Sequence, residues 1–307
     1  MAKLTYLVGL PKSNKTLYAE KLKTEKPGTV IFSPKEIRHV MKDTDCTEKD
    51  VFDILGRQTA EALGDGCDVI VDCTNVRSRS RRIFLDTALF GIPCEKECVI
   101  MATPLDVCIS RNHECGDIPD KVIMSMYSNW ETPAYWEGWN SIWAYYEDKS
   151  WMGMAGKPTD FVSEYLKWDQ QSTTNRVPLG EHCNDVANIV TGLLERPGTW
   201  ERKANWRKEN LIQSALIHDC GKPSALTFDE NGNALYYHHA NMGGYEALFY
   251  EYPEDIDPIY VSALVSYHMA PYDWKTHPRN RMASLRTWGR DFYEDILALH
   301  EADMMAR

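Results

Sequence analysis

The sequence predicts two domains of different class, an α/β domain followed by an all-α domain. In the first half, short apolar runs alternate with longer amphipathic stretches, which is typical of a parallel sheet with helices on both faces. From Leu179 onward the apolar spacing is helical. Glycine, proline and a polar run between Lys149 and Pro178 interrupt both patterns. We therefore expect a first domain over residues 1–155, a linker over 156–178 and a second domain over 179–307.

Composition limits the classes of protein to consider. The chain has 307 residues, of which 43% are hydrophobic, enough for two ordinary cores. Nine cysteines without a CxxC pair favour a reduced, cytoplasmic protein, and no apolar stretch reaches the ~18 residues of a membrane span. The net charge of −11 argues against bulk electrostatic binding of nucleic acid. Any contact with nucleic acid must be local, through the arginines of 77–82 or the basic residues of 275–290. For each of these clusters, an ordinary solvated surface is the alternative.

The first domain is expected to begin with a strand, a glycine-containing loop and an amphipathic helix. Further helices are expected near 48–63 and 78–90. Strands are expected at 4–8, 29–32, 69–72 and 98–101, each as a short apolar run of the length typical of a buried strand.

The loop after the first strand reads Gly9-Leu10-Pro11-Lys12-Ser13-Asn14-Lys15-Thr16. A G-x-x-x-x-G-K-[ST] loop between a strand and a helix is typical of phosphate binding: backbone N–H groups hold phosphate, the lysine reaches the β and γ phosphates, and the hydroxyl holds Mg²⁺. Asn14 replaces the second glycine, and asparagine tolerates positive φ better than most residues. We expect ATP or another nucleoside triphosphate to bind with Mg²⁺ through Gly9, Ser13, Asn14, Lys15 and Thr16. A plain strand-to-helix turn is the alternative.

Asp72 ends the apolar run 68–72, where an acidic residue can meet Mg²⁺ or its water shell. A strand-end aspartate that caps the next turn is the alternative. Further along, aromatic residues crowd positions 127–151. Trp136, Trp139 and Trp143 have helical spacing and predict a packed helix at the domain junction. The alternative is a surface that stacks bases, worth ~1–3 kcal/mol for each base.

The first half resembles the P-loop domain of phage-type polynucleotide 5′-hydroxyl kinases. The resemblance covers about 150 residues and is carried by Gly9–Thr16, Ser33–Arg38, Asp72–Asn75, Thr103–Leu105, Arg111-Asn112 and Pro133–Gly138. It implies that Arg38 holds the phosphate of the acceptor. It also implies that Arg111 is one of two lid arginines that clamp the donor.

The sequence departs from that family at the general base and at the second lid arginine, which are Lys35 and Cys115 here. Glu36 does not replace the base, because Ser33-Pro34-Lys35-Glu36 has the pattern of a capping box, and residue 36 lies about 100° around the helix from residue 35. General-base catalysis is typically worth ~10²–10⁴-fold. We therefore expect the domain to retain nucleotide binding, with slow kinase turnover.

The second half carries metal-binding side chains on each of five expected helices, at 181–195, 205–219, 239–250, 256–269 and 289–305. The run 214–223 delivers His218 and Asp219 at the end of an apolar helix, with Lys222 close by as a cation suited to phosphate. Residues at the ends of separate helices can converge in a bundle. Histidine and carboxylate ligands suit Mn²⁺, Fe²⁺, Co²⁺, Ni²⁺ or Zn²⁺. For any one histidine, a packed core residue is the alternative. The other candidates are His182, His239, His268 and Asp303.

In chain order these residues read H…HD…H…H…D, which resembles the HD phosphohydrolase superfamily over nearly all of residues 180–307. The resemblance implies a first metal ion held by His182, His218, Asp219 and Asp303. It implies that Asp219 also reaches a second ion held by His239 and His268, and that Lys222 contacts the substrate phosphate. His239 is preferred to His238 because the spacing that follows it fits the family better. Two bridged ions can activate water for attack on phosphorus.

Together the halves resemble two-headed enzymes that heal nucleic-acid ends, in which one head phosphorylates a 5′-hydroxyl and the other removes a terminal phosphate. We expect this function, on RNA or DNA ends and without a membrane partner. One alternative is a nucleotide phosphohydrolase or phosphodiesterase whose first domain only senses nucleotide, which Lys35 and Cys115 favour. Another is a catalytically silent nucleotide-binding module that uses its metal for stability.

Overall fold

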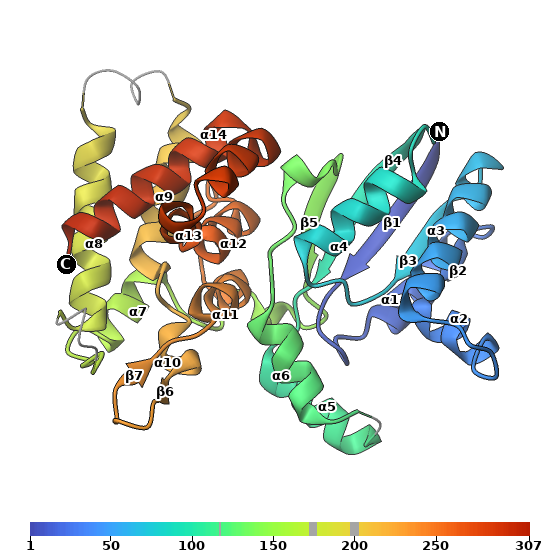
Figure 1. Cartoon of the computed structure of the whole chain (residues 1–307), viewed down its shortest axis with the longest axis horizontal. Helices are drawn as coiled ribbons and strands as arrows, with labels where there is room; N and C mark the ends of the chain where they lie inside the picture. The colour runs from blue at the N-terminus through green and yellow to red at the C-terminus, as the bar shows by residue number, and fades with distance from the viewer. Residues whose placement is uncertain (117, 172–176, 197–202) are drawn as a thin grey trace. The chain divides into compact units, whose positions relative to one another are not determined.

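The computed structural model describes residues 1–116, 118–171, 177–196 and 203–307, and the chain forms two compact units (Figure 1). The N-terminal unit comprises Met1–Met126 and Pro133–Glu147, and the C-terminal unit comprises Tyr127–Thr132 and Asp148–Arg307. Residues 148–171, which were expected to be the end of the first domain and part of the linker, thus lie in the C-terminal unit, whose start was expected at residue 179. The reason is backbone pairing: the N–H of Ala155 donates to the carbonyl of Phe249, and the N–H of Glu251 donates to that of Gly156. Residues 172–176 of the expected linker lie outside the described residues.

The N-terminal unit contains a five-stranded parallel sheet in the order β2-β3-β1-β4-β5. Its strands are β1 Ala2–Val8, β2 Val30–Phe32, β3 Val69–Asp72, β4 Cys94–Met101 and β5 Ser141–Tyr145. Its helices are α1 Lys15–Glu25, α2 Pro34–Val40, α3 Glu48–Gly64, α4 Ser78–Ile83 and α5 Leu105–Cys115, followed by α6 Asp120–Ser128, which runs into the other unit. Alternation of strands and helices predicts this parallel sheet, and the prediction is confirmed.

The four expected strands are all present, and β4 begins four residues earlier than expected. The expected helix at 78–90 is shorter as an α-helix, because it widens into a π-helix over Phe84–Ala88. Leu7 pairs with Asp72 and Val8 with Ile100, so the carboxyl ends of β1, β3 and β4 lie side by side. In open α/β sheets this edge is where ligands bind.

The predicted helix through Trp136, Trp139 and Trp143 is wrong. Residues Tyr135–Glu137 form one turn of 3-10 helix, Gly138 follows with φ 104°, and Trp143 lies in β5. A left-handed glycine ends the helical turn, and the parallel partner β4 then holds the chain extended. Trp139 is buried against Tyr6, so packing rather than base stacking accounts for this ring.

The C-terminal unit is helical apart from a small antiparallel pair, β6 Thr227–Phe228 and β7 Ala234–Leu235. Its helices are α7 Pro158–Glu164, α8 Leu179–Leu194, α9 Asn205–Ile217, α10 Lys222–Ala225, α11 His239–Glu246, α12 Pro258–Tyr267, α13 Ala270–Thr276 and α14 Pro278–Met305. The five expected helices are confirmed. The last one begins earlier, at Pro278, and its expected start at 289 is a break where Gly289 has non-helical backbone angles.

The core of this unit lies where α8, α9 and α12 pack together. Leu179, Ile217, Val261 and Val265 are fully buried there. Within the parts of the chain that the structure describes, no helix combines the length and apolarity needed to cross a membrane.

Candidate functional site

The loop between β1 and α1 has the backbone shape of a phosphate-binding loop. Asn14 has φ 59° and ψ 28°, so the left-handed conformation expected at the replaced glycine is present. Lys15 is buried, and its Nζ donates to the carbonyl of Leu10 at 2.7 Å and to that of Gly9 at 3.2 Å. Burial lowers the pKa of Lys15, while the carboxylate of Asp72 acts in the opposite direction. The lysine thus lies across its own loop.

The groups expected to hold Mg²⁺ lie together at the end of the sheet. The hydroxyl of Thr16 donates to Oδ2 of Asp72 at 2.6 Å. A Cβ at Gly9 would lie 2.8 Å from Oγ of Ser13 and 2.9 Å from Cβ of Met101, so only glycine fits there. An oxygen pair of this kind, beside a lysine and a helix N-terminus, fits the Mg²⁺ complex of a nucleoside triphosphate.

Sequence reasoning missed Glu147, which follows β5 at the same edge. Its two carboxylate oxygens accept hydrogen bonds from Nδ2 of Asn14 at 3.0 and 2.9 Å. Arg111 donates to Oε2 of Glu147 at 2.9 Å and to the carbonyl of Lys12 at 3.3 Å. Asn14 therefore does more than tolerate the left-handed conformation, because its amide binds a carboxylate that also pairs with the expected lid arginine. The asparagine at the glycine position is the sequence signal.

The expected acceptor residues lie on α2 and its surroundings. Arg38 makes two hydrogen bonds of 2.8 Å to Glu48, and this ion pair is exposed. The backbone N–H of Glu36 donates to Oγ of Ser33 at 3.2 Å, which is one of the two bonds of the expected capping box. Lys35 is exposed, as is Cys115 at the end of α5. Arg38 therefore has a carboxylate partner within this unit.

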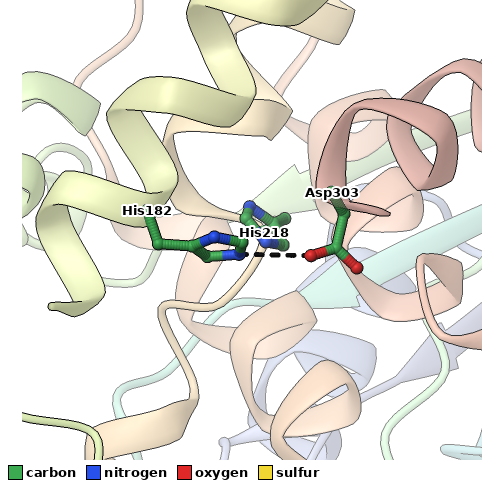
Figure 2. A group of neighbouring side chains, drawn as sticks. All are labelled: His182, His218 and Asp303. Carbon is green, nitrogen blue, oxygen red and sulfur yellow. Dashed lines mark ion pairs between the residues drawn. The ribbon is translucent and has the colours of Figure 1, made fainter. Parts of the chain in front are cut away.

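In the C-terminal unit, five segments bring the six expected metal ligands into one buried cluster. They are His182 in α8, His218 and Asp219 at the end of α9, His239 at the start of α11, His268 at the end of α12 and Asp303 in α14. Their exposed fractions lie between 0% and 8%. Figure 2 shows three of them, with the ring of His182 facing the carboxylate of Asp303 at 3.2 Å.

Backbone carbonyls orient three of the four imidazoles. In His218, His239 and His268, Nδ1 lies 2.8 Å from the carbonyl oxygen three residues earlier in the chain. A carbonyl only accepts, so these contacts assign the ring proton to Nδ1. When the ring is neutral, Nε2 then carries the lone pair, which is the form of histidine that binds a metal.

The carboxylate of Asp219 lies between two groups of ligands. Its Oδ2 lies 3.4 Å from Nε2 of His218 and 3.7 Å from Nε2 of His182. Its Oδ1 lies 3.2 Å from Nε2 of His239 and 3.6 Å from Nε2 of His268. Two sets of donor atoms come within 4.8 Å of one another: His182, His218 and Asp303 in the first, and Asp219, His239 and His268 in the second.

Unsatisfied nitrogen atoms indicate that this cluster fits a metal. Both ring nitrogens of His182 and Nε2 of His218 are buried and, among the described residues, have no hydrogen-bond partner. Nε2 of His239 lies only 3.3 Å from Nε2 of His268. Buried polar atoms are normally hydrogen-bonded, and a cation between facing lone pairs removes both problems. The donor set suits Mn²⁺, Fe²⁺, Co²⁺, Ni²⁺ or Zn²⁺.

The charge states agree with ligation. Burial raises the pKa of Asp219, but Lys222 and His218 lower it by more, so that it lies well below its usual range. Burial and the adjacent imidazoles lower the pKa of His268 to about 3. Burial also lowers the pKa of His218, yet the Asp219 carboxylate raises it well above its usual range. A proton on His218 is the positive charge that a metal ion would replace.

Further side chains support the ligands, and of these sequence reasoning missed Tyr272, Arg307 and Gln170. Tyr272 donates its hydroxyl to Oδ2 of Asp303, and Arg307 lies 3.3 Å from the same oxygen. Nζ of Lys222 lies 2.6 Å from Oδ2 of Asp219 and donates to Oε1 of Gln170 at 2.7 Å. No motif marks Tyr272, Arg307 or Gln170, whereas Lys222 was expected from the sequence. Of the neighbouring pair at 238 and 239, the first imidazole is exposed and the second is in the cluster.

Two glycines allow the ligand-bearing segments to approach one another. A Cβ at Gly221 would lie 2.1 Å from the carbonyl oxygen of His239, and a Cβ at Gly244 would lie 1.8 Å from Oγ of Ser266. Side chains do not tolerate such distances. Glycine at these positions therefore lets the His218–Lys222 segment pack on α11, and lets α11 pack on α12.

The fold and loop of the N-terminal unit define a P-loop kinase-like domain. Residues 4–133 match the profile of the AAA_33 family, described as an AAA domain. The chain is 29% identical over 151 residues to the L-seryl-tRNA(Sec) kinase of Methanococcus maripaludis, covering 45% of this chain and 56% of that protein. The chain thus spans just over half the length of this curated relative.

Two solved structures resemble this chain at lower sequence identity. One is the Pnkp1/Rnl/Hen1 RNA repair complex, at 20% identity and a TM-score of 0.37 over 41% of this chain and 42% of that one. The other is the APS kinase CysC of Mycobacterium tuberculosis with AMPPNP and APS, at 17% identity and a TM-score of 0.35 over 47% of this chain and 88% of that one.

Proposed function

We propose that this protein processes nucleic-acid ends, with a metal-dependent HD-type phosphohydrolase in the C-terminal unit and a P-loop kinase-like domain in the N-terminal unit. One observation carries the proposal: Nε2 atoms of four imidazoles lie 3.2–3.7 Å from the carboxylate of Asp219, and Asp303 joins two of them. Buried ring nitrogens of His182 and His218 have no hydrogen-bond partner among the described residues. The P-loop kinase-like domain in the same chain supports a phosphate-bearing substrate.

Two groups of residues would each hold a metal ion: His182, His218 and Asp303 in one, and Asp219, His239 and His268 in the other. Oδ2 of Asp219 also lies 3.4 Å from Nε2 of His218, so this carboxylate would serve the first ion as well. When bound, such ions lower the pKa of water and neutralise the charge of a phosphate ester. Lys222 is the cation of this site closest to Asp219, and it contributes a point charge for a phosphate oxygen. Tyr272 and Arg307 hold the carboxylate of Asp303 in place. These residues together suit hydrolysis of a phosphate monoester or cyclic phosphodiester.

The N-terminal unit binds ATP with Mg²⁺ in this proposal, through Lys15, Thr16 and Asp72. Phosphoryl transfer depends mainly on positioning and electrostatics, and these groups are present. Lys35 stands where a general base is expected. Transfer to a 5′-hydroxyl is therefore ~10²–10⁴-fold slower than in a kinase that has a general base at this position. The phosphohydrolase is the principal activity.

The test is a substrate panel with the metal-loaded protein. Oligonucleotides of RNA and DNA carrying a 3′-phosphate, a 2′,3′-cyclic phosphate or a 5′-phosphate are compared with free nucleotides, and phosphate or ring-opened product is measured. We expect release from oligonucleotide ends, and loss of that release after chelation. Hydrolysis of free nucleotides alone would support the second candidate below, and hydrolysis of none of them would overturn both.

A second test concerns the kinase half. Transfer of labelled γ-phosphate to a 5′-hydroxyl oligonucleotide is compared between the wild type and Lys35→Asp. We expect weak transfer in the wild type and a gain of 10-fold or more, on the order of the general-base contribution, in the variant. Robust transfer by the wild type, unchanged in the variant, contradicts a weakened kinase.

A second candidate is a nucleotide phosphohydrolase or phosphodiesterase whose N-terminal unit only senses nucleotide. The pairing of Arg38 with Glu48 favours it, because the residue expected to hold an acceptor phosphate already has a carboxylate partner. The substrate panel separates the two candidates.

A further inference from the structure

Lys222 is held by two oxygen atoms from different segments of the C-terminal unit. Its Nζ lies 2.6 Å from Oδ2 of Asp219 and donates to Oε1 of Gln170 at 2.7 Å. The ammonium group also lies 5.6 Å from the centre of the Tyr236 ring. An ammonium group has three N–H donors. Two are used by these oxygens, which leaves one, among the described residues, for an oxygen of the substrate.

Gln170 is fixed at both ends. It is 1% exposed, its Nε2 donates to the carbonyl of Val177 at 2.7 Å, and its own backbone carbonyl accepts a hydrogen bond from the hydroxyl of Tyr236. Because one end of the amide must donate and the other must accept, its orientation is determined. A buried amide held in this way presents one oxygen, in one direction, to Lys222.

The oxygen of Asp219 that contacts Lys222 is also the oxygen next to His218 and His182. If Lys222 had Asp219 as its sole partner, its positive charge would compete with a cation for that oxygen. The amide oxygen of Gln170 gives the ammonium group a second partner, so that Lys222 does not pair with Asp219 alone. Because this amide is neutral, it does so without cancelling the charge that a phosphate needs.

We propose that Gln170 is a positioning residue that keeps the ammonium group of Lys222 directed at the substrate phosphate and away from full pairing with Asp219. Gln170 acts through Lys222 and does not touch the reacting atoms. This inference rests on the proposed phosphohydrolase function. It adds a residue that no motif in the sequence marks.

The inference predicts different effects for two substitutions. Gln170→Leu removes the acceptor, so binding of inorganic phosphate to the Mn²⁺-loaded protein is expected to weaken about 10-fold, and Mn²⁺ affinity several-fold. Gln170→Glu keeps the shape of the side chain and still accepts a hydrogen bond from Lys222, but its negative charge offsets the positive charge of the ammonium group. Phosphate binding is then expected to weaken about 10-fold while Mn²⁺ affinity stays within twofold. Mn²⁺ and phosphate affinities are measured by titration calorimetry on the full chain.

A double-mutant cycle decides whether Gln170 acts through Lys222. In a Lys222→Met background, Gln170→Leu is expected to have no further effect on phosphate affinity. Equal losses in both backgrounds would overturn the inference, because they indicate a separate, structural role. Gln171 is the matched control, since this neighbouring glutamine is exposed. Gln171→Leu and Gln171→Glu should leave both affinities unchanged, and thermal unfolding checks that each variant folds.

The same titrations distinguish the inference from the proposed function. If the wild type binds no Mn²⁺ or other transition metal, the proposed function fails and the inference fails with it. If the wild type binds metal and phosphate and the cycle is additive, the inference alone fails. For hydrolysis of an active oligonucleotide substrate, Gln170→Glu should raise KM about 10-fold with little change in kcat, a pattern that loss of folded protein would not produce.

Discussion

The phosphate-binding loop and the histidine–aspartate cluster are assembled in opposite ways. Most of the phosphate-binding groups of the loop come from the consecutive residues Gly9–Thr16. From the adjacent strand, Asp72 accepts a hydrogen bond from the hydroxyl of Thr16. The cluster takes six side chains from five segments between residues 182 and 303. The loop binds through backbone shape, whereas the cluster binds through side chains that meet only when the helices pack.

This difference decides how each site responds to change. A loop made of neighbouring residues keeps its shape as long as the strand and helix on either side of it form. A cluster made from distant helices depends on every contact between them, including those at Gly221 and Gly244. Its buried polar atoms are also costly when unpaired. We therefore expect larger effects of single substitutions in the cluster than in the loop.

The largest expected effect is that of Asp219→Asn. Oδ2 of Asp219 faces His182 and His218, and Oδ1 faces His239 and His268, so both metal positions should lose affinity. Phosphate release should then fall by on the order of 10³-fold, about 4 kcal/mol. The ratio of metal to protein and the rate of phosphate release measure it. Asp255→Asn, at an exposed position, is the control. ATP binding should not change. Two metal ions retained per chain would contradict a shared carboxylate.

A smaller loss, of stability, is expected from Glu137→Gln in the N-terminal unit. Glu137 and Arg81 are buried and joined by hydrogen bonds of 2.6 and 2.8 Å, and Arg81 also donates to the carbonyl of Asn75 at 3.0 Å. Removing one charge of a buried pair costs ~3–5 kcal/mol in the free energy of unfolding. Urea unfolding measures this loss.

The exposed pair between Arg38 and Glu48 is the matched comparison for that prediction. Both side chains are largely in solvent, so Glu48→Gln should cost no more than ~1 kcal/mol. A similar cost for the two glutamine variants would show that burial of the Arg81–Glu137 pair adds nothing to the stability of the N-terminal unit.

Next in size is the effect of Lys15→Ala on nucleotide binding. Loss of charge-assisted hydrogen bonds to phosphate should weaken Mg²⁺-ATP binding ~10–100-fold. Titration calorimetry measures the affinity, and Lys21→Ala, on an exposed position of α1, is the control. Metal content of the C-terminal unit should stay the same. An unchanged ATP affinity would show that Lys15 does not contact phosphate and that this loop is not the nucleotide site.

The smallest effect is expected from Glu147→Gln. This carboxylate binds Asn14 and pairs with Arg111, so it occupies groups that a phosphate would otherwise meet. Because the pair is partly exposed, Mg²⁺-ATP affinity should rise by no more than ~10-fold. The exposed Glu95→Gln is the control. A fall in affinity would mean that Glu147 helps to hold the nucleotide.

Local patterns were sufficient to predict most elements and the shape of the phosphate-binding loop. The apolar runs at 4–8 and 69–72 became strands, and the positive φ of Asn14 was expected from its place in the motif. Helical spacing misled at Trp143, because intervals of three and four residues occur in a helix and also in a chance run of aromatic residues. The neighbouring strand β4 decided that outcome, and no local pattern contains it.

By itself, the sequence determined the alternation of strands and helices, the phosphate-binding motif and the set of histidines and aspartates able to bind metal. Each of these is a property of neighbouring residues or of residue type. Only the tertiary structure decided that Asp219 lies between two groups of imidazoles, that Glu147 meets Asn14, and that Gln170 holds Lys222. These contacts join residues tens of positions apart or depend on side-chain orientation, and packing of the whole chain sets both.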